Sequence, residues 1–192
     1  MTSTLARLGT RLGTRLGTRL GPPVAAVTAI GLFVASPAIA GADRIRAEGT
    51  LVRYSDTVPV GATARVQAVY DASGHTVVTL HVWGLAPNTE YGAHAHRAAC
   101  GSVGSAAGPH FQHVVDPVTP STDPAYANPG NEIWLDLTTD ADGNGAATTR
   151  LDWQFEPDRR AQSVIIHVEH THTGPTDSGV AGTRLACLTV GF

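Results

Sequence analysis

The sequence predicts an all-β fold, an antiparallel sandwich of short strands interrupted by two long loops. Only 15% of the residues are charged and 42% are apolar, and the chain contains 21 Gly and 12 Pro. This composition is typical of short strands joined by many turns rather than of long helices. Alternating or β-branched runs recur between Gly, Pro, Asn and Asp, and no helical period of useful length competes with them. Together these patterns indicate one sandwich domain.

Seven strands are expected in order along the chain, at residues 63–70, 76–83, 91–96, 132–137, 145–151, 163–169 and 183–190. Residues 71–74 and 140–144 have the composition of hairpin connections, because Gly and Asn tolerate the positive φ of tight turns. The stretches 98–130 and 170–182 are rich in Gly, Pro, Ser and Thr and are expected to be long surface loops. Loops of this length inside a compact domain are usually functional.

Residues 1–40 have the pattern of an export signal, with an Arg-rich start, an apolar run and the small residues of a signal peptidase site at 38–40. Cleavage after this site would leave one domain of about 150 residues, 41–192. An uncleaved membrane anchor is the alternative. It is disfavoured because the apolar run is shorter than about 18 residues and is broken by Gly31 and Pro37. We therefore expect a secreted, periplasmic or cell-envelope protein without a stable membrane span after cleavage.

The expected mature domain is acidic. All 13 basic residues of the chain are Arg, and four of them precede the apolar run, which leaves 9 Arg against 16 acidic residues and a net charge of about −7 with His neutral. The Arg residues are scattered rather than gathered into a basic stripe. This charge distribution argues against nucleic acid as a partner.

The chain has two cysteines, Cys100 and Cys187. In an oxidising compartment such a pair is expected to form a disulfide that persists. The bond would close a loop of about 87 residues and contribute roughly 4 to 5 kcal/mol in the chain-entropy model. Two unpaired buried thiols are the alternative.

Histidines are clustered. All nine lie in 41–192, and seven of them fall into three groups: 94/96, 110/113 and 167/170/172. His94 and His96 are two apart on an expected strand, so their rings leave the same face about 7 Å apart, close enough to chelate one ion. His110 follows a rigid Gly-Pro pair and His167 lies in an apolar strand, so four imidazoles can converge. Such a nitrogen set suits copper, zinc, nickel or iron rather than calcium or magnesium.

From about residue 52 to 192 the sequence resembles the copper/zinc superoxide dismutase family. Five motifs occur in that family's order and rough spacing: Tyr91-Gly-Ala-His-Ala-His96, Cys100, Gly108-Pro-His-Phe111, Ile166-His-Val-Glu169 and Gly182-Thr-Arg-Leu-Ala-Cys187. The resemblance implies an eight-stranded Greek-key sandwich or barrel, in agreement with the strand pattern. It also places both cysteines where the family has its disulfide.

Motif by motif, the resemblance implies that His94, His96 and His167 bind copper and that His110 bridges copper and zinc. Arg184 matches the active-site arginine, which would attract a small anion. The implied activity is the copper-dependent dismutation of superoxide to oxygen and hydrogen peroxide.

The sequence departs from the family where zinc is normally bound, because residues 114–136 contain no His. His113 and Asp116 could form a partial zinc site, but we expect the site to be absent or partial and the protein to be a copper-only variant. The second ring nitrogen of His110 would then need another partner, for which His113 and Glu132 are candidates.

The remaining histidines receive no ligand role. His170 and His172 lie in a Thr/Gly/Pro loop and are interpreted as solvated, with secondary metal capture as the alternative, and His75 and His81 are isolated.

Two other functions stay open. A non-enzymatic extracytoplasmic copper buffer would use the same histidines, although it would not need Arg184 unless that residue only bonds loop carbonyls. A purely adhesive sandwich would leave four convergent His without a purpose.

Overall fold

The computed structural model describes residues 43–192, so the expected export signal lies outside the described residues. The described part contains ten strands and one short 3-10 helix: β1 Asp43–Thr50, β2 Val52–Arg53, β3 Thr63–Tyr70, β4 Thr76–Trp83, β5 Glu90–Tyr91, β6 Ala93–His96, η1 Gly104–Ala107, β7 Leu137–Thr138, β8 Gly145–Leu151, β9 Ser163–His167 and β10 Arg184–Thr189. No helix in residues 43–192 has the length and apolar character needed to cross a membrane.

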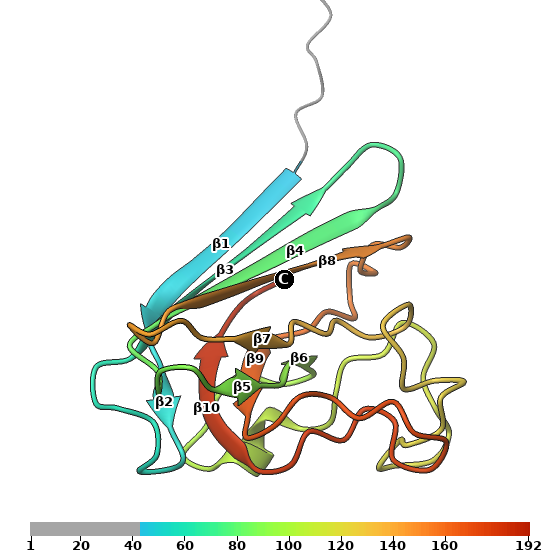
Figure 1. Ribbon diagram of the computed structural model, residues 1–192. Coiled ribbons are helices and arrows are strands. Elements are labelled where there is room, and N and C mark those ends of the chain that lie inside the picture. The colour runs from blue at the N-terminus through green and yellow to red at the C-terminus, as the bar shows by residue number, and fades with distance from the viewer. Residues whose placement is uncertain (1–42) are drawn as a thin grey trace, which may run out of the picture. The chain divides into compact units, whose positions relative to one another are not determined.

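Two four-stranded antiparallel sheets face each other, and they account for eight of the strands. The first has the order β1-β3-β4-β8 and the second β2-β10-β9-β6, while β5 and β7 form a separate pair. In Figure 1 the long strands of the first sheet run across the top of the domain and the second sheet lies below them. The predicted all-β sandwich is therefore confirmed.

The core lies between the sheets and follows the period of two that strands impose. In β3 and β4 every second side chain is buried, as in Val66 of β3 and Leu80 of β4. From the second sheet, Val164, Ile166 and Leu188 join the same apolar cluster. The alternating runs visible in the sequence thus mark the inner faces.

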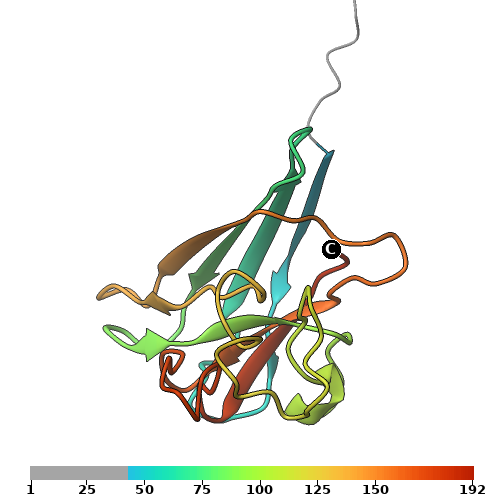
Figure 2. The same ribbon diagram turned by 90° about the vertical axis from the view of Figure 1, so that its right-hand side faces the viewer.

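Strands β6 and β9 of the second sheet are buried on both faces. All residues of β6 and β9 are buried, because the two long loops cover the outer face of this sheet. The turned view in Figure 2 shows these loops, yellow-green and red, lying on the side away from the first sheet. Ser178 in the later loop donates a hydrogen bond to the carbonyl of Ala127 in the earlier one at 2.6 Å, which ties the loops together.

The strands differ from the sequence prediction in four places. The short β2 was not predicted, and the expected strand at 91–96 is divided into β5 and β6. β1 was not predicted because its inward-facing residues, Ile45, Ala47 and Gly49, form a weak apolar pattern. These positions are only partly buried. The expected strand at 132–137 is irregular: it borders β6 through an isolated bridge at Trp134 and joins the β5/β7 pair only at its end.

Candidate metal centre

His94 and His96 lie on the outer face of the second sheet, beneath the loops. Their neighbours Ala93 and Ala95 point into the core, as the alternation of a strand requires. Antiparallel pairing with β9 sets His94 opposite Ile165. Both histidine side chains are fully buried.

His167 ends β9 on the same outer face, because Val164 and Ile166 of this strand point inward. Pairing with β10 places Arg184 opposite His167, and the register shifts between Arg184 and Ala186. Such a bulge re-aims a side chain. The shift brings a half-buried arginine beside the histidine cluster, where its Nη1 donates to the carbonyl of Gly104 at 2.8 Å.

His110 comes from the first long loop. On both sides of this residue the loop is bonded to β6 or to the residue that follows it, by Phe111 N–H to Ala95 O at 2.8 Å and by Arg97 N–H to Pro109 O at 3.1 Å. Phe111 is buried against the rings of Trp153 and Phe155. His110 is therefore held over the strand that carries His94 and His96.

The four rings present a consistent set of nitrogens. Carbonyl oxygens only accept hydrogen bonds, so Nδ1 of His96, facing Gly108 O at 3.0 Å, and Nδ1 of His167, facing Gly182 O at 3.2 Å, each carry the proton. Both accepting glycines have a positive φ, a conformation that favours Gly. Nε2 of His96, Nε2 of His167 and Nδ1 of His94 are buried without a hydrogen-bond partner.

These unpartnered nitrogens mark a candidate metal centre, because buried polar atoms are usually paired and here three of them lie in one group of histidines. One ligand atom from each of the four histidines lies within 4.8 Å of all the others. Two nitrogens on opposite sides of an ion bound at about 2 Å are about 4 Å apart, so the set needs only a small contraction. The residues fit a copper or similar ion; among residues 43–192 they form the one such group.

Burial favours the neutral form of His94, His96 and His167. It lowers the pKa of His94 and His96 well below the usual range, and the neighbouring His110 adds to the effect. Burial also lowers the pKa of His167 to about 4. Neutral imidazoles are the form that binds a metal ion.

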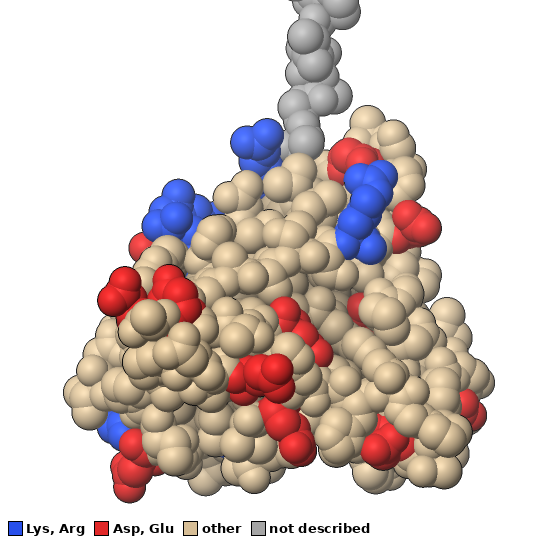
Figure 3. All heavy atoms as spheres, in the orientation of Figure 1, with Lys and Arg blue, Asp and Glu red and all other residues tan. Residues whose placement is uncertain are grey.

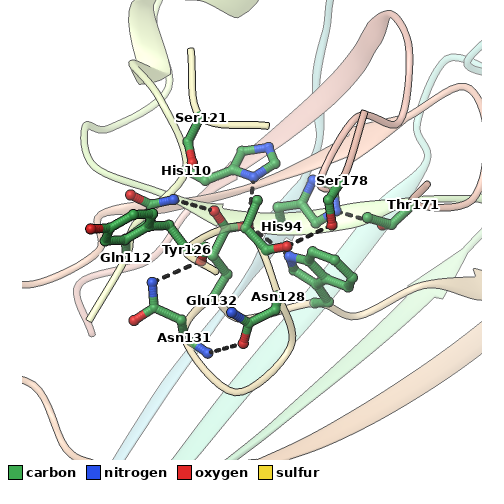
Figure 4. A network of polar contacts seen from close by, with 12 residues as sticks. His94, His110, Gln112, Ser121, Tyr126, Asn128, Asn131, Glu132, Thr171 and Ser178 are labelled. Atoms are coloured by element: carbon green, nitrogen blue, oxygen red, sulfur yellow. Dashed lines mark hydrogen bonds and ion pairs between the residues drawn. The ribbon is translucent and has the colours of Figure 1, made fainter. Parts of the chain in front are cut away.

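Glu132 occupies the side of His110 away from the other rings. Its Oε2 accepts from His110 Nδ1 at 2.8 Å and its Oε1 from Gln112 Nε2 at 2.8 Å. Figure 4 shows His110 and Gln112 both directed at this carboxylate. Of the two orientation partners that the sequence offered, the structure places Glu132 at His110.

His113 and Asp116 are not part of the histidine group. The ring of His113 stacks on Trp153 at 4.8 Å between centroids. The carboxylate of Asp116 accepts from the Val118 N–H and from the Ser121 hydroxyl. Both side chains are thus engaged in holding the loop.

The other histidines also lie outside the group. His170 donates to the carbonyl of Leu137 at 3.0 Å, and His172 contacts Asp177 at 2.9 Å. His75 lies between two aspartates, and His81 stacks on Trp83.

Cys100 and Cys187 form the predicted disulfide, which joins the first loop to β10.

A cleft of about 330 Å³ opens beside the centre and reaches His110, His167 and Arg184. Its charged lining consists of three arginines and two acids, Arg97, Arg159, Arg184, Asp116 and Glu132. The cleft is therefore locally positive, although acidic groups dominate the lower part of the face in Figure 3.

Sequence reasoning missed Thr171, whose hydroxyl contacts His94, and Asp136, which accepts a hydrogen bond from that hydroxyl. Their spacing of 35 residues and their lack of a repeating pattern left no signal for a shared role.

Comparisons with known proteins give matches to copper/zinc superoxide dismutases. A Cu/Zn superoxide dismutase from Brucella abortus has a similar fold, with a TM-score of 0.51 and 19% identity over 76% of this chain and 98% of that one. A double mutant of a superoxide dismutase-like protein from Bacillus subtilis gives a TM-score of 0.54 and 16% identity over 74% and 95%. No curated protein matches. The family model for copper/zinc superoxide dismutase matches residues 60–190, more than half of the sequence, and the chain therefore belongs to that family.

Proposed function

We propose that this protein is a copper-dependent superoxide dismutase that works outside the cytoplasm. The observation that carries the proposal is a set of four converging imidazoles beneath a positively lined cleft, three of which are buried and have an unpartnered nitrogen. Membership of the family supports the activity. The disulfide supports an oxidising compartment.

Copper bound by His94, His96, His110 and His167 would supply the one-electron chemistry, in which one superoxide is oxidised to oxygen and a second, with two protons, is reduced to hydrogen peroxide. Arg184 attracts and orients the anion at the cleft. His110 donates its Nδ1 proton to Glu132, which leaves Nε2 as the nitrogen that would bind copper or, when free of the metal, hold a proton for the product.

Zinc is not required in this proposal. Glu132 occupies the outer nitrogen of His110, and Asp116 is engaged by loop groups. Elemental analysis after loading with both metals is expected to give about one copper and much less than one zinc per chain. Stoichiometric zinc beside copper would contradict the copper-only part of the proposal.

The decisive experiment compares superoxide consumption by the copper-loaded protein with that by free copper ions. Wild type should exceed free copper, and His167→Ala should lose both copper binding and activity. Copper binding without activity above free copper would favour the non-enzymatic copper buffer.

The intact mass of protein from the exported fraction tests the expected cleavage near Gly41, and a retained N-terminus would contradict that cleavage.

A further inference from the structure

Thr171 connects a histidine of the proposed copper site to a carboxylate on another segment. Its hydroxyl lies 2.6 Å from His94 Nε2 and 2.6 Å from Asp136 Oδ1. Its backbone N–H donates to Asp136 Oδ2 at 2.8 Å. One loop residue is thereby fixed to Asp136 twice while it touches the metal-site ring. Figure 4 shows Thr171 beside His94.

The donors and acceptors in this chain run in one direction. An ionised carboxylate only accepts, and a hydroxyl has one hydrogen to give. The Thr171 hydroxyl therefore donates to Asp136, and it must accept from His94, which places the proton of that ring on Nε2. The direct distance from His94 Nε2 to Asp136 Oδ1 is 4.0 Å, too long for a hydrogen bond. The hydroxyl is the only link between the two groups among the described contacts.

We propose that Thr171 is a positioning residue whose hydroxyl couples Asp136 to His94, holds the His94 proton on Nε2 and thereby presents the Nδ1 lone pair to the copper site. The metal-affinity part rests on the proposed function. The proton placement does not, because it concerns the copper-free ring.

The geometry makes this link selective. His94 has no exposed surface, so an Nε2–H that loses Thr171 has no water to turn to. The loop itself keeps other attachments, namely the Thr171 N–H to Asp136 and His170 to the Leu137 carbonyl. Removal of the hydroxyl alone should therefore release the ring without releasing the loop.

Three variants test the proposal. Thr171→Val removes the hydroxyl and keeps the shape, and Thr171→Ser keeps the hydroxyl. Thr173→Val is the matched control, because Thr173 is exposed in the same loop and its side chain has no hydrogen bond among the described contacts. The readouts are the nitrogen-15 NMR tautomer of His94 in copper-free protein, the Cu(II) affinity by competition, and the electron paramagnetic resonance spectrum of bound Cu(II).

Wild type, Thr171→Ser and Thr173→Val should show a single Nε2-protonated His94, whereas Thr171→Val should show a mixture of tautomers. Cu(II) affinity should fall by about 10-fold or more only in Thr171→Val, with an altered Cu(II) spectrum. If Thr171→Val does not fold by circular dichroism, Asp136→Asn replaces it. That variant removes the charge at the far end of the chain, and it should weaken Cu(II) binding and change the spectrum in the same direction.

A single Nε2 tautomer and unchanged Cu(II) affinity in Thr171→Val would overturn the proposal. Equal losses in Thr171→Ser, or in Thr173→Val, would overturn it as well, because the hydroxyl would not be the cause. The failure of the proposed function looks different: wild type would bind no copper, or would bind it without dismutation, while the tautomer of His94 would still respond to Thr171.

Discussion

Glu132 accepts a hydrogen bond from His110 Nδ1 at 2.8 Å although the glutamate is only 1% exposed. The same Oε2 also accepts from Trp134 Nε1 at 2.7 Å, and Oε1 accepts from Gln112 Nε2. A buried carboxylate is tolerated only when it is paired and hydrogen-bonded. Three donors meet this requirement, so Glu132 holds the His110 ring from the side opposite the proposed copper.

Glu132→Gln should destabilise the protein and slow its consumption of superoxide. An amide has one oxygen for three donors, and its own N–H groups meet donors rather than acceptors. Leaving a buried donor unpaired costs about 1 to 3 kcal/mol in the free energy of unfolding. A misplaced His110 should also reduce superoxide consumption by about 10-fold. Urea unfolding and activity of the copper-loaded variant measure the two effects.

The exposed Glu90 offers a matched control. Glu90→Gln makes the same chemical change without buried donors, and it should leave both stability and activity unchanged. Equal behaviour of the two variants would show that Glu132 does not orient His110.

Copper-free protein should lose stability as the pH falls below about 6.5. The pKa of His94, His96 and His167 is lowered by burial in the folded state, to about 4 for His167. The unfolded chain then binds more protons than the folded one between about pH 6.5 and about pH 4, so stability decreases with acid in this window. Each histidine contributes a slope of at most about 1.4 kcal/mol per pH unit.

Urea unfolding across this window measures the slope. Bound copper should shift the loss to lower pH, because protons and metal compete for the same nitrogens. A stability that is constant from about pH 7 to about pH 5 in copper-free protein would contradict the neutral, buried state of these rings.

The fold was largely predictable because its signals are local. The alternation in β3 and β4 marks the inner face directly, and the turns between strands have a characteristic composition. β1 escaped prediction because its inner face carries only Ile45, Ala47 and Gly49, so its stability depends on pairing with β3 rather than on its own apolar pattern.

The convergence of the four histidines was also predictable, since His94 and His96 share a strand face and the other two stand in recognisable motifs. Glu132 was one of two candidates for the partner of His110, but the link from His94 through Thr171 to Asp136 was not predictable. Asp136 reaches Thr171 only through the packing of irregular segments, and nothing in its local sequence distinguishes it from surface acids such as Asp123.

Loss of the disulfide should destabilise both the domain and its site. The bond between Cys100 and Cys187 closes a loop of 87 residues, which corresponds to roughly 4 to 5 kcal/mol in the chain-entropy model. The loop after Cys100 also supplies the carbonyl of Gly108 to His96 and that of Gly104 to Arg184. Cys100→Ser with Cys187→Ser should therefore lower the free energy of unfolding and weaken copper binding.

Denaturant unfolding of this double variant, and of wild type with and without reductant, checks the effect. Reduction of the double variant should change nothing further. A double variant as stable as wild type would show that packing alone holds the first loop against β10.

Arg184→Ala should leave copper binding nearly intact while it lowers superoxide consumption, because the guanidinium lies beside His167 in the cleft and is not one of the four nitrogen ligands. Steering of an anion into a focused cleft raises on-rates by roughly 10-fold or more. Arg44→Ala is the matched control: it removes the same charge from an exposed position on β1. If the effect is local to the cleft, superoxide consumption should fall in Arg184→Ala and change little in Arg44→Ala.

Salt separates steering by Arg184 from a structural role. Raising the ionic strength from about 0.01 to about 0.15 M shortens the screening length from about 30 to about 8 Å. Superoxide consumption should fall with salt in wild type and less steeply in Arg184→Ala. The ratio of the wild-type rate to the variant rate should therefore decrease toward one. A ratio independent of salt would mean that Arg184 acts by holding the Gly104 carbonyl rather than by attracting the anion. Loss of copper from Arg184→Ala would likewise refute the steering role and favour the copper buffer over the enzyme.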